Sequence, residues 1–208
     1  MPQGGEGHPC VGFWMGYFHC MLRNRVSLYL VLAGGSKGNG DGDEATTPAL
    51  ALGGEGGIVA DLISCLEAVL EEKSGELAFL GLRQVFMLNN KDAIVRRAVR
   101  SDLAMFLLSG WARAREERMD RYIKSYLDVS WMPVVSRLAA VAAKPATVTV
   151  LRRRRDPLAT FSSVLENACS AQRCWKVPRP VLRRVLRRTV SEHVMPAYRR
   201  CVEENPHA

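Results

Sequence analysis

The chain has 208 residues, of which 48% are hydrophobic and 24% charged, so it has the length and composition of a folded protein with a sizeable core. No stretch reaches the roughly 20 apolar residues that a membrane-spanning helix needs, and the six cysteines are irregularly spaced, which favours free thiols in an intracellular protein. The net charge of +8 is concentrated in residues 151–200, where 13 Lys and Arg face 3 acidic residues, and this indicates an anionic partner.

The first 57 residues hold a partial helical segment, 1–33, and a Gly-rich block, 34–57. Nine of the 24 residues in the block are glycine, which predicts a flexible linker. The block lacks the GxxxxGK[ST] spacing of a phosphate-binding loop, because Gly38 follows Lys37. His8, Cys10, His19 and Cys20 could be imagined as zinc ligands, but their spacing matches no common structural zinc site.

Apolar residues recur with a helical period through the rest of the chain, residues 58–208, which we predict to be one helical bundle. Trp131 and Trp175 are predicted to be core anchors. The only strand signal is "TVTVL" at 147–151, so the fold class is predicted to be all-α. The predicted helices cover 58–74, 77–88 (ended by Asn89-Asn90), 111–143 (kinked at Pro133), a segment from Pro157 through Leu165, and 181–200 (kinked at Pro196).

Nothing in the sequence requires a reaction. The pairs Glu71-Glu72 and Glu116-Glu117 read as solvated helix faces. His193 has no orienting acid that would make it a base for Cys169 or Cys174. We therefore predict a protein that is not an enzyme and needs no cofactor or metal.

The segment "VPRPVLRRVLRRTVSEHVMPAYRR" carries seven arginines and one acidic residue. On a helix, Arg183, Arg187, Arg184 and Arg188 fall within about 140° of one another, and the apolar residues of 181–190 fill the remaining arc. A solvated basic face would look the same. A second arginine run, 152–155, lies within 40 residues of the first, however, and guanidinium groups can donate two parallel hydrogen bonds to phosphate oxygens. The predicted lipid-binding residues are Arg152, Arg153, Arg154, Arg155, Arg183, Arg184, Arg187 and Arg188.

Three stretches resemble the Exo-seventy family of exocyst complex subunits, in its plant form. They are "LRQVFMLNNKDAIVRRAV" (82–99), "WARAREERMDRYIKSYLDVSWMPVVSRL" (111–138) and "FSSVLENACSAQRCWKVPRPVLRRVLRRTVSEHVMPAYRRCV" (161–202), with its W-x-V-P and P-A-Y-R. The opening "HPCVGFWMGYFHCMLRNRVSLYLVL" is similar to the family's preceding segment. The resemblance covers about 8–33 and 58–202 and implies the family's C-terminal part, with the Gly-rich block and the early end after P-A-Y-R as departures.

The resemblance implies stacked antiparallel helical bundles in an elongated rod, and a subunit that tethers secretory vesicles to the plasma membrane. It also implies three kinds of partner: other exocyst subunits, small GTPases and membranes containing phosphatidylinositol 4,5-bisphosphate. The expected location is cytoplasmic and peripheral at the plasma membrane, with no nucleic acid bound. Two alternatives stay open. One is a basic helical nucleic-acid-binding protein, although the basic helix lacks interleaved aromatic residues. The other is a truncated copy without a tethering role.

Overall fold

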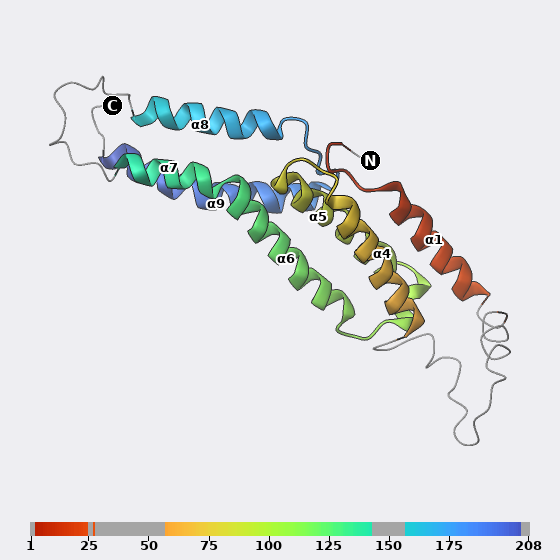
Figure 1. The fold of residues 1–208 in the computed structure, drawn as a ribbon. Helices are drawn as coiled ribbons and strands as arrows, with labels where there is room; N and C mark the ends of the chain where they lie inside the picture. The colour runs from red at the N-terminus through yellow and green to blue at the C-terminus, as the bar shows by residue number, and fades with distance from the viewer. Residues whose placement is uncertain (1–2, 25–26, 28–56, 143–156, 205–208) are drawn as a thin grey trace, which may run out of the picture. The chain divides into compact units, whose positions relative to one another are not determined.

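The computed structural model describes residues 3–24, 27, 57–142 and 157–204 (Figure 1). All regular secondary structure in these ranges is helical, which confirms the all-α class. The isolated strand signal at 147–151 and all of the Gly-rich block except Gly57 lie outside the described residues. The elements are α1 (Pro9–Arg23), α4 (Ile58–Ser74), α5 (Leu80–Val99), η1 (Asp102–Phe106), α6 (Trp111–Ser130), α7 (Met132–Ala142), α8 (Pro157–Gln172) and α9 (Pro180–Glu204).

The chain divides into two compact units, and two of the divisions fall inside α5 and α6, after residues 89 and 120. The first unit takes residues 1–2, 7–76 and 90–120. The second takes residues 3–6, 77–89 and 121–208. The boundaries predicted from composition, 1–33, 34–57 and 58–208, stay a prediction.

In the first unit, α1 packs against α4 and η1. The His8 side chain caps α1 by accepting a hydrogen bond from the Cys10 backbone N–H at 3.2 Å, and Pro9 occupies the first turn. Both helices bury residues at spacings of four, three and four, which lie on one face of a helix. The buried residues are Val11, Met15, Phe18 and Leu22 in α1, and Val59, Ile63, Leu66 and Leu70 in α4.

The prediction that Asn89-Asn90 ends a helix is wrong, because α5 continues through the pair to Val99. Both side chains are buried and hydrogen-bonded. Asn90 Oδ1 accepts from the His8 backbone N–H at 2.7 Å, and Asn89 Nδ2 donates to the carbonyls of Gly5 and Lys176 at 2.6 and 2.8 Å. Since the amides find distant backbone partners, they do not compete for the backbone of their own helix.

The predicted helix 111–143 is two helices, α6 and α7, separated at Trp131. Pro133 lies in the first turn of α7, where its missing N–H needs no partner. Trp131 fills the break and is buried, as predicted, and its indole Nε1 donates to the Tyr126 hydroxyl at 2.9 Å. That hydroxyl donates to Gln172 Oε1 at 2.6 Å, so one hydrogen-bonded chain joins α6 and α8.

Trp175 is only half-buried, so the prediction of a core anchor holds less well there. Its ring lies 6.4 Å from the rings of both Phe79 and Tyr126. It also lies against Gly81, where an added Cβ would come within 2.9 Å of the indole. The glycine therefore allows α5 to approach the segment that precedes α9.

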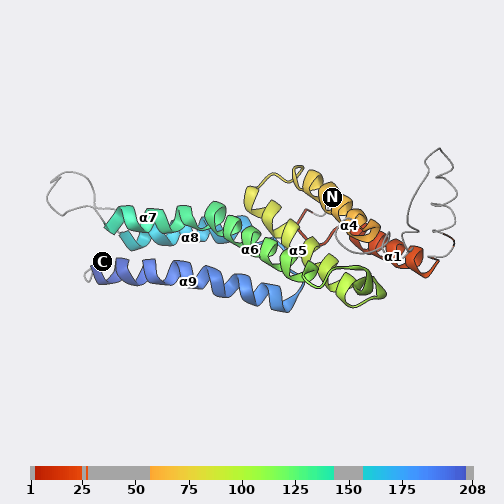
Figure 2. The ribbon, with the colours of Figure 1, turned by 90° about the horizontal axis from the view of Figure 1, so that it is seen from below.

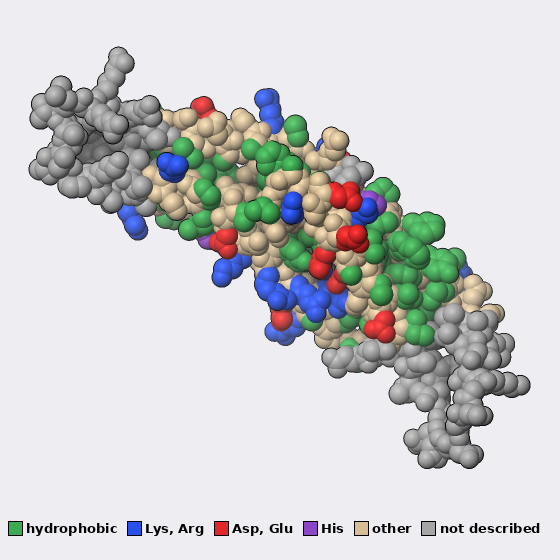
Figure 3. Space-filling model, viewed as in Figure 1, with side chains coloured by type: hydrophobic (Ala, Val, Ile, Leu, Met, Phe, Trp, Pro, Cys, Tyr) green, Lys and Arg blue, Asp and Glu red, His purple; other side chains and the backbone are tan. Residues whose placement is uncertain are grey.

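Replacing Trp131 with alanine is expected to lower the free energy of unfolding by about 3–5 kcal/mol, because a buried indole is lost and a cavity remains. Denaturant unfolding followed by circular dichroism measures the change. Trp14→Ala is the matched control, since Trp14 is 41% exposed on α1, over which hydrophobic side chains gather at the surface in Figure 3. Equal unfolding midpoints for the two variants would contradict a core role for Trp131.

In the second unit, α7 lies against both α8 and α9 (Figures 1 and 2). The helix α9 has 25 residues and continues through Pro196 to Glu204. Proline in a helix interior removes one backbone hydrogen bond, here the one to the Glu192 carbonyl. This long helix carries the arginines that the sequence singles out.

Candidate functional site

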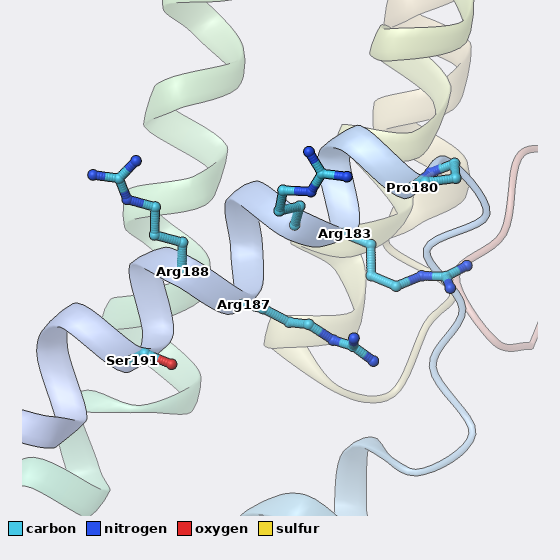
Figure 4. Close-up of a pocket in the computed structure, with 6 residues that line it drawn as sticks. Pro180, Arg183, Arg187, Arg188 and Ser191 are labelled. Atoms are coloured by element: carbon cyan, nitrogen blue, oxygen red, sulfur yellow. The ribbon is translucent and has the colours of Figure 1, made fainter.

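The basic helix α9 is packed on one side and exposed on the other. Leu182, Leu186 and Val194 are buried, at 4%, 6% and 8% exposure. All four predicted arginines of this helix are exposed: Arg183, Arg184, Arg187 and Arg188. Together with Pro180 and Ser191 they line an open hollow along the helix (Figure 4). We call these six residues the arginine strip.

The start of α9 is held in place by the segment before it. The Lys176 backbone N–H donates to the Gly4 carbonyl at 2.7 Å, and the Lys176 carbonyl accepts from Asn89. Gly5 adopts a φ of 74°, and an added Cβ there would approach Leu82 to 2.8 Å, so glycine is required. Residues 3–6 and Asn89 thus fix the backbone from which the arginine strip begins.

The four arginines differ in how they are engaged. Arg183 donates from Nε to the Val177 carbonyl at 3.0 Å and from Nη2 to the Pro178 carbonyl at 3.4 Å, so it holds the segment before α9. Arg188 Nε pairs with Glu192 Oε1 at 2.7 Å, and this hydrogen bond raises the pKa of Arg188. Arg184 and Arg187 have no hydrogen-bond or ion-pair partner among the described residues. These two guanidinium groups are the ones most available to a ligand.

The guanidinium groups spread along the helix. In Figure 4 the side chains of Arg187 and Arg188 extend in different directions from the ribbon. Because all the lining residues belong to one helix, the strip is an open surface that suits several separate phosphate groups.

Two apolar residues do not lie where the sequence pattern placed them. Val181 and Val185 were expected on the packed side of the helix, but they are 52% and 41% exposed. On the helical wheel they stand about 40° apart and next to Arg188, at the edge of the apolar arc. The neighbouring helices cover the arc around Leu182 and Leu186 and leave this edge open.

The other residues that the sequence suggested for binding or catalysis are not part of the arginine strip in the described structure. Arg152, Arg153, Arg154 and Arg155 lie outside the described residues, so their addition to the strip stays a prediction. His193 Nδ1 lies 3.0 Å from the Thr189 carbonyl of its own helix. Within the part of the chain that the structure describes, no three His, Cys, Asp or Glu side chains gather to hold a metal ion. In the same ranges no helix is long and apolar enough to cross a membrane.

A buried ion cluster in the first unit is a feature that the sequence reading missed. Glu67 is 5% exposed, and its carboxylate oxygens lie 3.4 Å from Lys91 Nζ and 3.2 Å from Arg115 Nε. Burial lowers the pKa of Arg115, and the nearby Glu67 charge opposes that shift. The carboxylate is fully engaged by cations, which fits a structural role. The position of Glu67 on the apolar face of α4 is the sequence signal that could have indicated this cluster.

The family model for the C-terminal part of Exo70, which is one of the subunits of the exocyst complex, matches residues 1–207. The chain belongs to this family. Three Exo70 relatives from Arabidopsis thaliana are named exocyst complex components. EXO70B2 is 28% identical and EXO70B1 24% identical, each over 195 residues, which is 94% of this chain and 30% of the relative. EXO70A3 is 24% identical over 145 residues, or 68% of this chain and 25% of the relative. The chain thus spans between a quarter and a third of the length of these curated Exo70 relatives.

Proposed function

We propose that the chain acts as an exocyst-type tethering subunit, which links secretory vesicles to the plasma membrane by binding other proteins and phosphatidylinositol 4,5-bisphosphate. Membership of the Exo70 family supports the tethering role, since the relatives are exocyst complex components. The arginine strip supports the lipid contact. The proposed location is cytoplasmic and peripheral at the plasma membrane, and the proposed role is that of an adaptor rather than an enzyme.

The observation that carries the lipid contact is the state of Arg184 and Arg187. Both are exposed on a packed helix and have no partner within the described ranges, so binding a phosphate would not require an existing ion pair to break. Guanidinium forks donate two hydrogen bonds to phosphate oxygens. A polybasic segment gains about 1 kcal/mol per Lys or Arg near an anionic leaflet.

A nucleic-acid ligand fits α9 less well. Proteins that bind single strands interleave basic residues with aromatic side chains on which bases stack. The sequence of α9 contains one aromatic residue, Tyr198, which lies ten residues beyond Arg188. The strip therefore offers charge for phosphate groups without the stacking surface that bases require.

The protein contacts are tested by affinity capture from the source cell with the 208-residue chain as bait, scored for other exocyst subunits and small GTPases. We expect both classes to be recovered. The Trp131→Ala variant, whose core is disrupted, serves as the control and should recover less. Capture of neither class by the folded wild-type chain would contradict the tethering role and favour a truncated copy without that role.

A further inference from the structure

The exposed side of α9 carries apolar side chains between its arginines. Val181, Arg184, Val185 and Arg188 are all exposed and follow the spacing i, i+3, i+4 and i+7. Residues with this spacing line up along one face of a helix. Val181 and Val185 are thus part of the same surface as the arginine strip, on the side of α9 that its neighbours leave uncovered.

The two valines are not needed for packing inside the described structure. The buried residues Leu182 and Leu186 already provide the inward-facing contact of this part of α9, at 4% and 6% exposure. Val181 and Val185 keep 52% and 41% of their surface exposed. Single exposed apolar residues are ordinary, but here two of them alternate with two cations.

We propose that Val181 and Val185 insert into the boundary between headgroups and acyl chains when the arginine strip binds an anionic membrane. This inference rests on the proposed function and names the mode of contact: α9 lies in the plane of the interface and does not act through charge alone. Met195, at 44% exposure, lies further along the same side, beyond Glu192, whose carboxylate pairs with Arg188 at 2.7 Å. Binding of such helices scales with the apolar area buried plus the attraction to anionic lipids.

The composition of this face favours a membrane over a partner helix as its occupant. Helix-on-helix packing calls for an apolar stripe about 100° wide or more, whereas this stripe is narrow and contains Arg184 and Arg188. The aliphatic part of an arginine side chain can pack against the acyl chains while its guanidinium group stays at the level of the phosphates. A lipid interface satisfies both kinds of side chain, with the guanidinium groups at the phosphates and the valines at the boundary with the acyl chains.

The test compares two double variants, each removing two exposed valines. V181S/V185S changes the two valines beside the arginine strip, and V69S/V99S changes valines of the first unit that are 47% and 52% exposed. All measurements use the 208-residue chain and phosphatidylcholine vesicles with phosphatidylinositol 4,5-bisphosphate, at low and high salt. We expect V181S/V185S to bind about 20- to 100-fold more weakly, because insertion would bury the exposed half of each valine and serine gains little from that burial. The salt dependence should be unchanged. V69S/V99S should bind like wild type.

A second readout reports insertion itself. Wild-type chain injected beneath a lipid monolayer of the same composition should raise the surface pressure, and V181S/V185S should raise it less. Equal vesicle affinity and equal pressure for wild type and V181S/V185S would overturn the inference and leave arginine-based binding intact. Unchanged vesicle binding combined with weaker capture of exocyst subunits would overturn it in favour of a protein-docking face. Wild-type chain that does not bind the vesicles at all would overturn the proposed lipid function as well.

Discussion

Exchanging Arg184 and Arg187 for glutamate is expected to weaken binding to vesicles that contain phosphatidylinositol 4,5-bisphosphate about a thousandfold. Each exchange changes the local charge by two units, and each unit contributes about 1 kcal/mol near an anionic leaflet. The expected loss is therefore about 4 kcal/mol, with tenfold in affinity for every 1.4 kcal/mol. Folding should survive, because both side chains are exposed and have no partner among the described residues.

The matched control is R113E/R121E, which makes the same change of charge on α6. Both of these arginines are exposed, and the Arg113 side chain is 85% exposed, so the substitutions should leave the fold intact. Arg183 is left unchanged because it holds the carbonyls of Val177 and Pro178. Vesicle sedimentation measures the affinities. An equal loss in both variants would mean that only the net charge matters and would contradict a binding surface on α9.

Removing the Glu67 carboxylate is expected to lower the free energy of unfolding by about 3–5 kcal/mol. Lys91 and Arg115 have side chains that are 2% and 8% exposed, and Glu67→Ala leaves both charges buried without their shared partner. Arg118 is less affected, since its Nη1 lies 3.8 Å away and its side chain is 49% exposed. Denaturant unfolding of the variant and of wild type measures the difference.

Glu71→Ala is the matched control, because Glu71 also pairs with Lys91, at 3.3 Å, but its side chain is 56% exposed. An exposed ion pair of this kind contributes about 1 kcal/mol or less. Adding Arg115→Met to Glu67→Ala should recover part of the lost stability, since the buried guanidinium group that pairs with Glu67 is then gone. Equal midpoints for Glu67→Ala and Glu71→Ala would contradict the buried cluster.

Helical periodicity predicted the fold class and most helices of the described ranges. In α4 the apolar spacing indicated the helix and its end near Ser74, although Val69, an apolar residue of this helix, is 47% exposed. In α9 the spacing of the four arginines was sufficient to predict that all of them are exposed. These features depend on residues within one or two helical turns.

Features that depend on residues far apart in the sequence could not be read in the same way. Asn89 lies inside α5 because Gly5 and Lys176, each more than 80 residues away, supply its hydrogen-bond partners. Glu67 finds Arg115 at a separation of 48 residues. No local sequence pattern indicates which distant backbone carbonyl or cation will pair with a polar side chain on an apolar helix face.

The exposure of Val181 and Val185 shows a further limit of the helical wheel. The wheel gives the arc that is apolar, but the neighbouring helices decide how much of that arc they cover. In α9 the covered part is centred on Leu182 and Leu186. The edge next to Arg188 stays exposed, so the exposed face of α9 carries apolar side chains as well as arginines.

The measurement that tests the central proposal most directly is wild-type binding to vesicles with and without phosphatidylinositol 4,5-bisphosphate, over a range of salt, beside duplex and single-stranded nucleic acid. We predict tight binding only to the vesicles that contain this lipid. The affinity should fall as salt shortens the Debye length from about 10 Å at 0.1 M. Equal binding to vesicles without the lipid, or tighter binding to nucleic acid than to the lipid-containing vesicles, would contradict the assignment of α9 as a phosphoinositide-binding surface.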